Sequence, residues 1–157
     1  MGLCNMVEGD FICNMDQMAV FFESKLTQTV HRKSDETIPV QNSCSNQDRM
    51  TVCLAITPSG KKLVPFIIFK GVPGGRIVKS LLDLLPDGVH GCCQEDGWMD
   101  EQNAPLWIAK VWKPYAEQVN NSFLLLDTFK CHMQSGFTEK LSDVGTEMEY
   151  IPASCTS

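Results

Sequence analysis

Two aspartates stand in otherwise apolar stretches and could act together on a phosphate group. Asp16 interrupts residues 10–23, and Asp127 directly follows the apolar run at residues 123–126. Two carboxylates about 4 Å apart repel each other by about 4 kcal/mol at an effective dielectric constant of about 20, so a close pair requires a proton, a cation or separation. Magnesium would relieve this repulsion, because it prefers oxygen ligands and usually keeps several waters. Two such ions can activate the attacking oxygen and stabilise the leaving oxygen in phosphoryl transfer.

A plainer interpretation of the two aspartates is also open. An aspartate at the end of a strand often caps the next helix or accepts hydrogen bonds within a loop. The separation of 111 residues between Asp16 and Asp127 does not distinguish these roles from metal binding. The pair becomes informative only if the fold brings the two strands side by side.

Alternating apolar residues predict the strands that would position Asp16. Residues 10–23 are expected to form a strand in which Ile12, Asn14, Asp16 and Met18 share one face. Between them and the next strand, residues 25–48 are polar and are expected to be mainly loop, with an exposed basic cluster at residues 31–33.

A hairpin is predicted after this loop. Residues 50–57 alternate cleanly, and residues 58–60 provide turn chemistry before a third strand at residues 63–69. Pro65 cannot donate a hydrogen bond to a ladder, so the third strand is expected at an edge of the sheet. A short helix or an insertion is expected near residues 81–85.

A helix is predicted next, capped by Asp100 or Asn103. Its buried face is expected to consist of residues at helical spacing: Ile108, Val111, Trp112 and Tyr115. Pro114 lacks a backbone donor and therefore predicts that the helix ends near Lys113. The three tryptophans of the chain are expected to pack rather than to stack on bases.

The second half of the chain supplies Asp127. The continuous apolar run at residues 123–126 predicts a strand covered on both faces, with Asp127 at its end. A helix containing Phe137, Leu141 and Val144 and a last strand at residues 148–151 follow. The order of elements predicts an α/β fold with a mixed sheet, in which neighbouring first and fourth strands would bring the acids together.

Composition limits the classes of function. The chain has 157 residues, of which 43% are hydrophobic, and a net charge of −6, so it is expected to form one domain with little general attraction to nucleic acid. Its eight cysteines form no Cys-x-x-Cys pair and are expected to be reduced thiols rather than zinc ligands. No signal peptide or membrane span is predicted.

Five segments of the chain carry a resemblance to one known family. The segments are residues 14–17 (NMDQ), 62–71 (KLVPFIIFKG), 97–101 (GWMDE), 125–132 (LLDTFKCH) and 151–157 (IPASCTS). Their order and spacing resemble the pogo-like DDE transposases, with their Tigger and Jerky relatives, over nearly the whole chain.

The resemblance implies a ribonuclease-H-like catalytic core that cuts and joins DNA in the nucleus with Mg²⁺ or Mn²⁺. Asp16 and Asp127 match the first and second catalytic acids, which are also the expected metal ligands. His132 matches the histidine of the motif, where packing or hydrogen bonding is expected rather than catalysis. Asp143, Glu147 and Glu149 precede the position of the third acid and are expected to be surface charges.

Departures from the family leave the present activity open. Gln17 and Met18 stand where the family usually has Glu-Thr, and Pro105 lies in a helix usually free of proline. Residues 1–157 are expected to be a partial domain, without the family's helix-turn-helix region and third-acid segment. Impaired strand cleavage is one expectation, and a domesticated, non-catalytic module that binds protein or DNA is the alternative. The acidic charge predicts weak DNA binding by this chain alone and favours protein partners.

Overall fold

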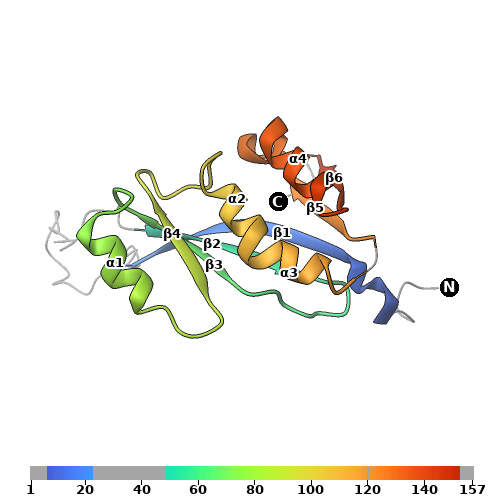
Figure 1. Ribbon diagram of the computed structural model, residues 1–157, viewed down its shortest axis with the longest axis horizontal. Coiled ribbons are helices and arrows are strands. Elements are labelled where there is room, and N and C mark those ends of the chain that lie inside the picture. Colours follow the sequence, from blue (N-terminus) through green and yellow to red (C-terminus); the bar gives the residue numbers. More distant parts are fainter. Residues whose placement is uncertain (1–6, 23–48, 120, 153–157) are drawn as a thin grey trace, which may run out of the picture.

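A single mixed sheet forms the centre of the protein. The computed structural model describes residues 7–22, 49–119 and 121–152, so the predicted loop at residues 25–48 and its basic cluster lie outside the described residues. The sheet has six strands in the order β4-β3-β2-β1-β5-β6 (Figure 1). Their bounds are β1 Ile12–Phe21, β2 Arg49–Ile56, β3 Phe66–Lys70, β4 His90–Gln94, β5 Phe123–Asp127 and β6 Glu147–Ile151.

The directions of the strands agree with the predicted fold class. β1, β2 and β3 form an antiparallel meander, while β1 also pairs in parallel with β5, and β5 with β6. A meander whose first strand pairs in parallel with a later strand is the arrangement that the ribonuclease-H-like expectation requires. The α/β prediction and the expected contact between the first strand and the strand carrying Asp127 are therefore confirmed.

The prediction that Pro65 places the third strand at a sheet edge is wrong. β4, which the sequence did not predict, pairs in parallel with β3 and forms that edge instead. Pro65 lies one residue before β3, so its missing N–H removes no donor from the ladder, and its carbonyl accepts a hydrogen bond from the His90 amide. The chain reaches β4 through helix α1 (Arg76–Asp83), which confirms the short helix expected there.

One nearly continuous helix crosses the sheet above β1 (Figure 1). It comprises α2 (Ala104–Trp107), a π-helical stretch at Ile108–Trp112 and α3 (Lys113–Ala116). It begins after Asn103, so Pro105 falls in the first turn, where a missing donor is tolerated. The prediction that Pro114 ends the helix near Lys113 is wrong. The π-helical stretch before Pro114 alters the i→i+4 hydrogen bonding that a proline interrupts, and the helix continues.

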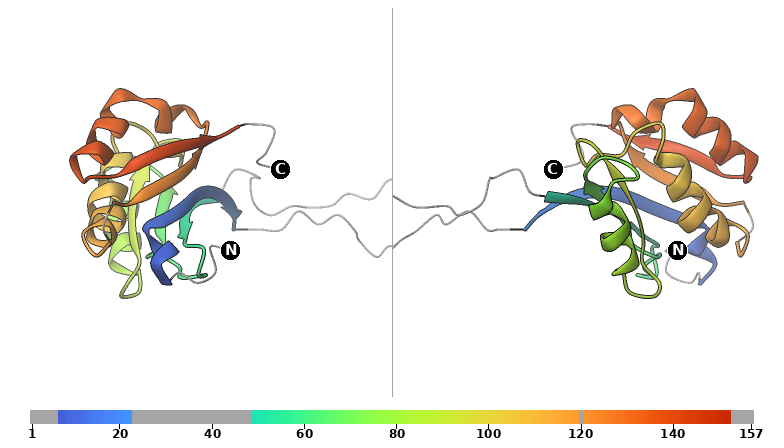
Figure 2. Two further views of the ribbon diagram at one scale, coloured as in Figure 1. Left: turned by 90° about the vertical axis from the view of Figure 1, so that its right-hand side faces the viewer. Right: turned by 60° about the vertical axis from the view of Figure 1, so that its left-hand side comes forward.

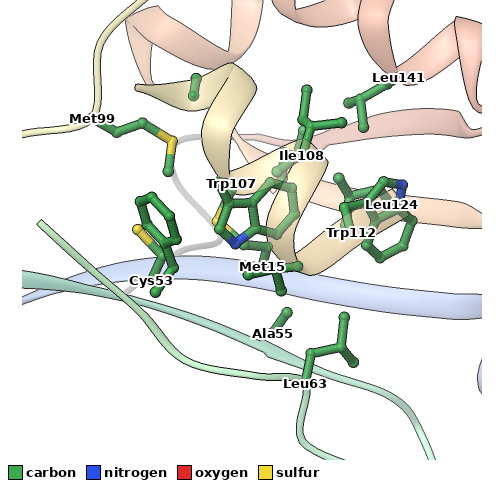
Figure 3. Close-up of a cluster of buried hydrophobic side chains, with 14 of the residues drawn as sticks. Met15, Cys53, Ala55, Leu63, Met99, Trp107, Ile108, Trp112, Leu124 and Leu141 are labelled. Atoms are coloured by element: carbon green, nitrogen blue, oxygen red, sulfur yellow. The ribbon is translucent and has the colours of Figure 1, made fainter. Parts of the chain in front are cut away.

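The π-helical stretch, whose turn is wider than that of an α-helix, also affects how the core packs. Trp107 and Trp112, five residues apart, stack with ring centroids 6.0 Å apart and an interplanar angle of 14°, and both are fully buried. Figure 3 shows them against Met15 of β1 and Leu124 of β5. The four residues predicted to form the buried face of this helix, Ile108, Val111, Trp112 and Tyr115, are all buried. This packing holds β1 and β5 together from one side.

The last two elements also match the prediction. Helix α4 (Ser135–Asp143) buries Phe137 and Leu141 and is followed by Gly145, whose φ of +69° suits a glycine at a helix end.

Figure 2 shows the sheet and the helices as separate layers. No helix in the described part of the chain is long and apolar enough to cross a membrane.

The other face of β1, β2 and β5 is more open to solvent. Alternation buries Cys13 and Met15, while Met18, Leu54 and Ile56 are 43–50% exposed. In β5 only Leu124 and Leu126 are buried, so the prediction that this strand is covered on both faces is wrong for its other residues. Asp16 and Asn14 belong to this more open face.

Candidate functional site

Asp16 lies in the interior of β1, where strand alternation turns it away from the core. Its neighbours Met15 and Gln17 point to the helix-covered side, and Asp16 itself is exposed. Its Oδ1 accepts a hydrogen bond from the Gln17 amide at 2.7 Å. Asp16 is opposite Leu54 of β2 in the antiparallel ladder. An acidic side chain is tolerated here because this face is open to water.

Asp127 is the last residue of β5, and the strand register relates it directly to Asp16. The parallel pairs between β1 and β5 run from Ile12↔Phe123 to Asn14↔Leu125. The same register extended by two residues sets Asp16 opposite Asp127. Neighbouring strands lie about 4.8 Å apart, so the pairing of β1 with β5 brings the two chain segments side by side up to two residues before each acid.

The two carboxylates have little cationic compensation. Asp127, whose side chain is 35% exposed, pairs with His132, and neither acid forms an ion pair with a lysine or arginine among the described residues. Like charges on adjacent strands repel, and a divalent cation relieves that repulsion. Exposed carboxylates that leave room for water suit the oxygen-rich, partly hydrated shell of Mg²⁺ or Mn²⁺. The residues therefore fit such an ion, although no group of three or more His, Cys, Asp or Glu side chains placed to hold one occurs within residues 7–22, 49–119 and 121–152.

His132 is fully buried beside Asp127, in the 3₁₀ turn Lys130–Met133. Its Nδ1 lies 2.8 Å from Asp127 Oδ1, and its Nε2 lies 2.9 Å from Gln17 Nε2. The imidazole ring also contacts the rings of Phe129 and Phe137, with centroids 5.8 and 5.5 Å apart. The prediction that this histidine hydrogen bonds and packs is confirmed.

The loop before α2 borders the same end of the sheet. Gly97 is held by a 2.6 Å hydrogen bond from Thr51 Oγ1 to its carbonyl. Trp98 is half-buried under the guanidinium of Arg49, which lies 3.7 Å from the ring centroid, and it also contacts Phe129. Together with the buried Trp107 and Trp112, this agrees with the prediction that the tryptophans pack.

Four buried cysteines are part of the hydrophobic core, and their thiols are not activated for catalysis. Burial raises the pKa of the Cys13, Cys92 and Cys131 thiols to about 12 and raises the pKa of the Cys53 thiol further. A thiol with a raised pKa carries little thiolate, the form that attacks and binds metals. The described cysteines are free thiols, and they lack the character of catalytic or zinc-binding cysteines.

A family match covers the part of the chain that contains Asp127 but not Asp16. The profile of the family described as "DDE superfamily endonuclease" matches residues 47–157, more than half of the chain. The protein belongs to the DDE superfamily of endonucleases.

The relatives of this DDE protein include pogo-derived proteins of mammals. It is 28% identical over 148 residues to "Pogo transposable element with KRAB domain" of Mus musculus, covering 92% of this chain and 23% of the relative. The human protein of the same name is 26% identical with the same coverage, and the human "Pogo transposable element with ZNF domain" is 23% identical over 93% of this chain and 10% of the relative. The DDE chain thus spans less than a quarter of the length of the curated relatives it matches.

Solved structures of a transposase are similar at a greater distance. The "Crystal structure of the Mos1 Strand Transfer Complex" aligns with a TM-score of 0.48 and 11% identity, over 92% of this chain and 36% of that chain. The "Crystal structure of a pre-cleavage Mos1 transpososome" gives a TM-score of 0.46 and 13% identity, over 88% and 35%. The assignment to the DDE superfamily rests on the family match rather than on these structures.

The sequence analysis singled out Asp16 and Asp127, and each lies two residues beyond the last pair of the β1–β5 ladder, Asn14↔Leu125. Asp143, Glu147 and Glu149 are exposed, as predicted for surface charges. The sequence analysis named Gln17 only as a departure from the family and missed its contact with His132, which joins β1 to a residue 115 positions away in the sequence. A contact between distant segments leaves no local pattern in the sequence.

Proposed function

We propose that this DDE domain performs metal-dependent phosphoryl transfer on DNA, cleaving and joining strands, with Asp16 and Asp127 as ligands of Mg²⁺ or Mn²⁺. The observation that supports the proposal is the parallel β1–β5 register, whose last pair, Asn14↔Leu125, lies two residues before each acid. The bound ions would supply charge stabilisation at the reacting phosphate. The protein's own part is to hold two oxygen ligands on a rigid sheet, at a face open to a large substrate.

This polypeptide alone should bind the ions weakly and turn over slowly. Two carboxylates supply few of the oxygen ligands that a tightly held ion needs, and no third acidic side chain joins them among the described residues. The net charge of −6 also opposes DNA binding, since affinity for DNA depends on cations that neutralise phosphates. A DNA substrate further implies a nuclear place of action, which a fluorescent fusion would locate.

The test compares metal binding by three carboxylate variants of the full chain. Asp16→Asn and Asp127→Asn each remove one charge from the pair, while Asp143→Asn removes a charge from the exposed end of α4 and serves as the matched control. Mn²⁺ is titrated while paramagnetic broadening of NMR signals near the pair is recorded, because this readout detects weak binding. Nicking of supercoiled plasmid by the same variants is measured in parallel.

We expect each site variant to weaken Mn²⁺ binding at least tenfold, because one of two ligands is lost, while the control binds like the wild type. Any nicking should depend on the metal and disappear in both site variants. If Asp16→Asn binds Mn²⁺ as well as the wild type, the metal-site proposal is wrong. The non-catalytic binding module then becomes the better account.

A further inference from the structure

A chain of three side chains, with the buried His132 at its centre, connects the two strands that carry the acids. Gln17 of β1 reaches His132, and His132 reaches Asp127 at the end of β5, with contacts of 2.9 and 2.8 Å. Gln17 Nε2 also contacts Met99 Sδ at 3.6 Å. Because His132 is completely buried, water does not compete for either of its ring nitrogens.

The chemistry of these groups determines where the imidazole proton lies. Gln17 presents its amide nitrogen, which can only donate, so His132 Nε2 must accept. In a neutral imidazole the other nitrogen then carries the proton, and Nδ1–H donates to Asp127 Oδ1. Gln17 and Asp127 therefore favour the same tautomer, and together they hold the imidazole in one orientation.

The histidine itself is held from several sides. The Tyr150 hydroxyl donates a 2.7 Å hydrogen bond to the His132 carbonyl, and the rings of Phe129 and Phe137 flank the imidazole. Asp127 Oδ1 also accepts a hydrogen bond from the Phe129 amide at 3.3 Å. Both donors use the same oxygen, so the other oxygen, Oδ2, has no hydrogen-bond partner among the described residues and is available to an external ligand.

We propose that His132, oriented by Gln17, is a positioning residue that fixes the rotamer of Asp127 so that its carboxylate meets a divalent cation in one orientation. This inference rests on the proposed function, because it assigns Asp127 a metal to face. Hydrogen bonds from outside the first ligand shell orient metal ligands, and removing them typically lowers metal affinity by about 10- to 100-fold. Gln17, which departs from the family pattern, thus has a specific task in this chain.

The first part of the test is spectroscopic and needs no metal. The ¹⁵N shifts of the His132 ring, measured above neutral pH in the full chain, report which nitrogen carries the proton. We expect the Nδ1-protonated tautomer in the wild type, because Gln17 donates to Nε2 and Asp127 accepts from Nδ1. An Nε2-protonated ring in the wild type would overturn the proposal.

The second part separates positioning from simple packing. His132→Phe keeps a ring between Phe129 and Phe137 but loses the donor to Asp127, whereas His132→Asn retains an amide N–H near the position of Nδ1. By Mn²⁺ titration we expect His132→Phe to bind at least tenfold more weakly than the wild type and His132→Asn to recover most of that loss. Circular dichroism at the titration temperature checks that each variant is folded.

The outcomes distinguish this inference from the function on which it rests. If the wild type itself binds no Mn²⁺, the proposed metal site fails, whatever the ring tautomer is. If the wild type binds Mn²⁺ through Asp16 and Asp127 but His132→Phe binds equally well, the metal site stands and the positioning role is refuted. Equal losses in His132→Phe and His132→Asn also refute it, because they would trace the effect to packing.

Discussion

Thr146 is the centre of a small buried hydrogen-bond network that connects the start of β6 to β5 and to the helix containing Trp112. Its hydroxyl accepts a hydrogen bond from Trp112 Nε1 and pairs with the Ser122 hydroxyl, each at 2.7 Å. The three side chains are 0–5% exposed. The adjacent amide of Glu147 donates to the Ser122 carbonyl at 2.9 Å, so the network sits where β5 and β6 both begin.

Thr146→Val keeps the shape of the side chain and removes its oxygen. The Trp112 indole N–H then has no acceptor, and the Ser122 hydroxyl loses its partner. A buried polar group left without a partner costs about 1 to 3 kcal/mol, so for these two groups together we expect a loss of about 2 to 6 kcal/mol in the free energy of unfolding. For a chain of this length that corresponds to a fall in melting temperature on the order of 10 °C.

Urea denaturation followed by tryptophan fluorescence measures this loss. The matched control is Thr146→Ser, which keeps the oxygen and loses one methyl group, at a cost of about 1 kcal/mol. The midpoint should fall much further in the valine variant while the denaturant slope stays unchanged. If the two variants agree within about 0.5 kcal/mol, the hydroxyl contributes nothing and the reasoning from buried hydrogen bonds is refuted.

Two further predictions follow from burial and backbone geometry. The buried thiols, whose pKa values are raised from about 9 to about 12, hold their protons more tightly in the folded state. Their contribution to the free energy of unfolding should therefore be constant below pH 9 and should fall as the pH rises toward 12, which urea titrations at several pH values above 8 would show. A flat profile above pH 9 would contradict this. Gly97→Ala should lower the stability of the protein more than Gly145→Ala. Both glycines have positive φ, so alanine is strained at either position. A Cβ on Gly97 would also lie 3.1 Å from Lys70 Cβ, whereas a Cβ on Gly145 meets nothing within 4 Å. Thermal melts of the two variants measure the difference, and equal losses would show that contact with Lys70 is unimportant.

Local pattern was enough to predict most of the fold. The strand around Asp16, the strand before Asp127 and the buried face of the helix containing Trp112 each follow a period that the sequence displays directly. The pair of acids could be chosen because charges are rare in apolar strands. Their proximity could be stated only conditionally, because the pairing of strands distant in sequence depends on the whole fold.

The errors had a different physical origin. β4 has the sequence HGCCQ, which contains no β-branched residues and no alternation of apolar and polar residues. Its strand conformation therefore comes from pairing with β3 rather than from intrinsic strand propensity. The helix continued past Pro114 because a wider turn accommodated the proline, a solution that propensity rules do not include. The contact between Gln17 and His132 required both partners to be placed in three dimensions.

The parallel register of β1 and β5 also determines which changes in chain length the protein can tolerate. Asp16 lies four residues beyond Ile12, and Asp127 lies four residues beyond Phe123, the partner of Ile12. Insertions or deletions in the loops between the two strands leave these counts unchanged, so the segment between the acids can grow or shrink freely. A single residue added within either strand between its paired position and its acid would turn that carboxylate to the opposite face. The relative position of the two acids therefore depends on the four residues between each acid and the Ile12↔Phe123 pair, rather than on the 111 residues that separate the acids in the sequence.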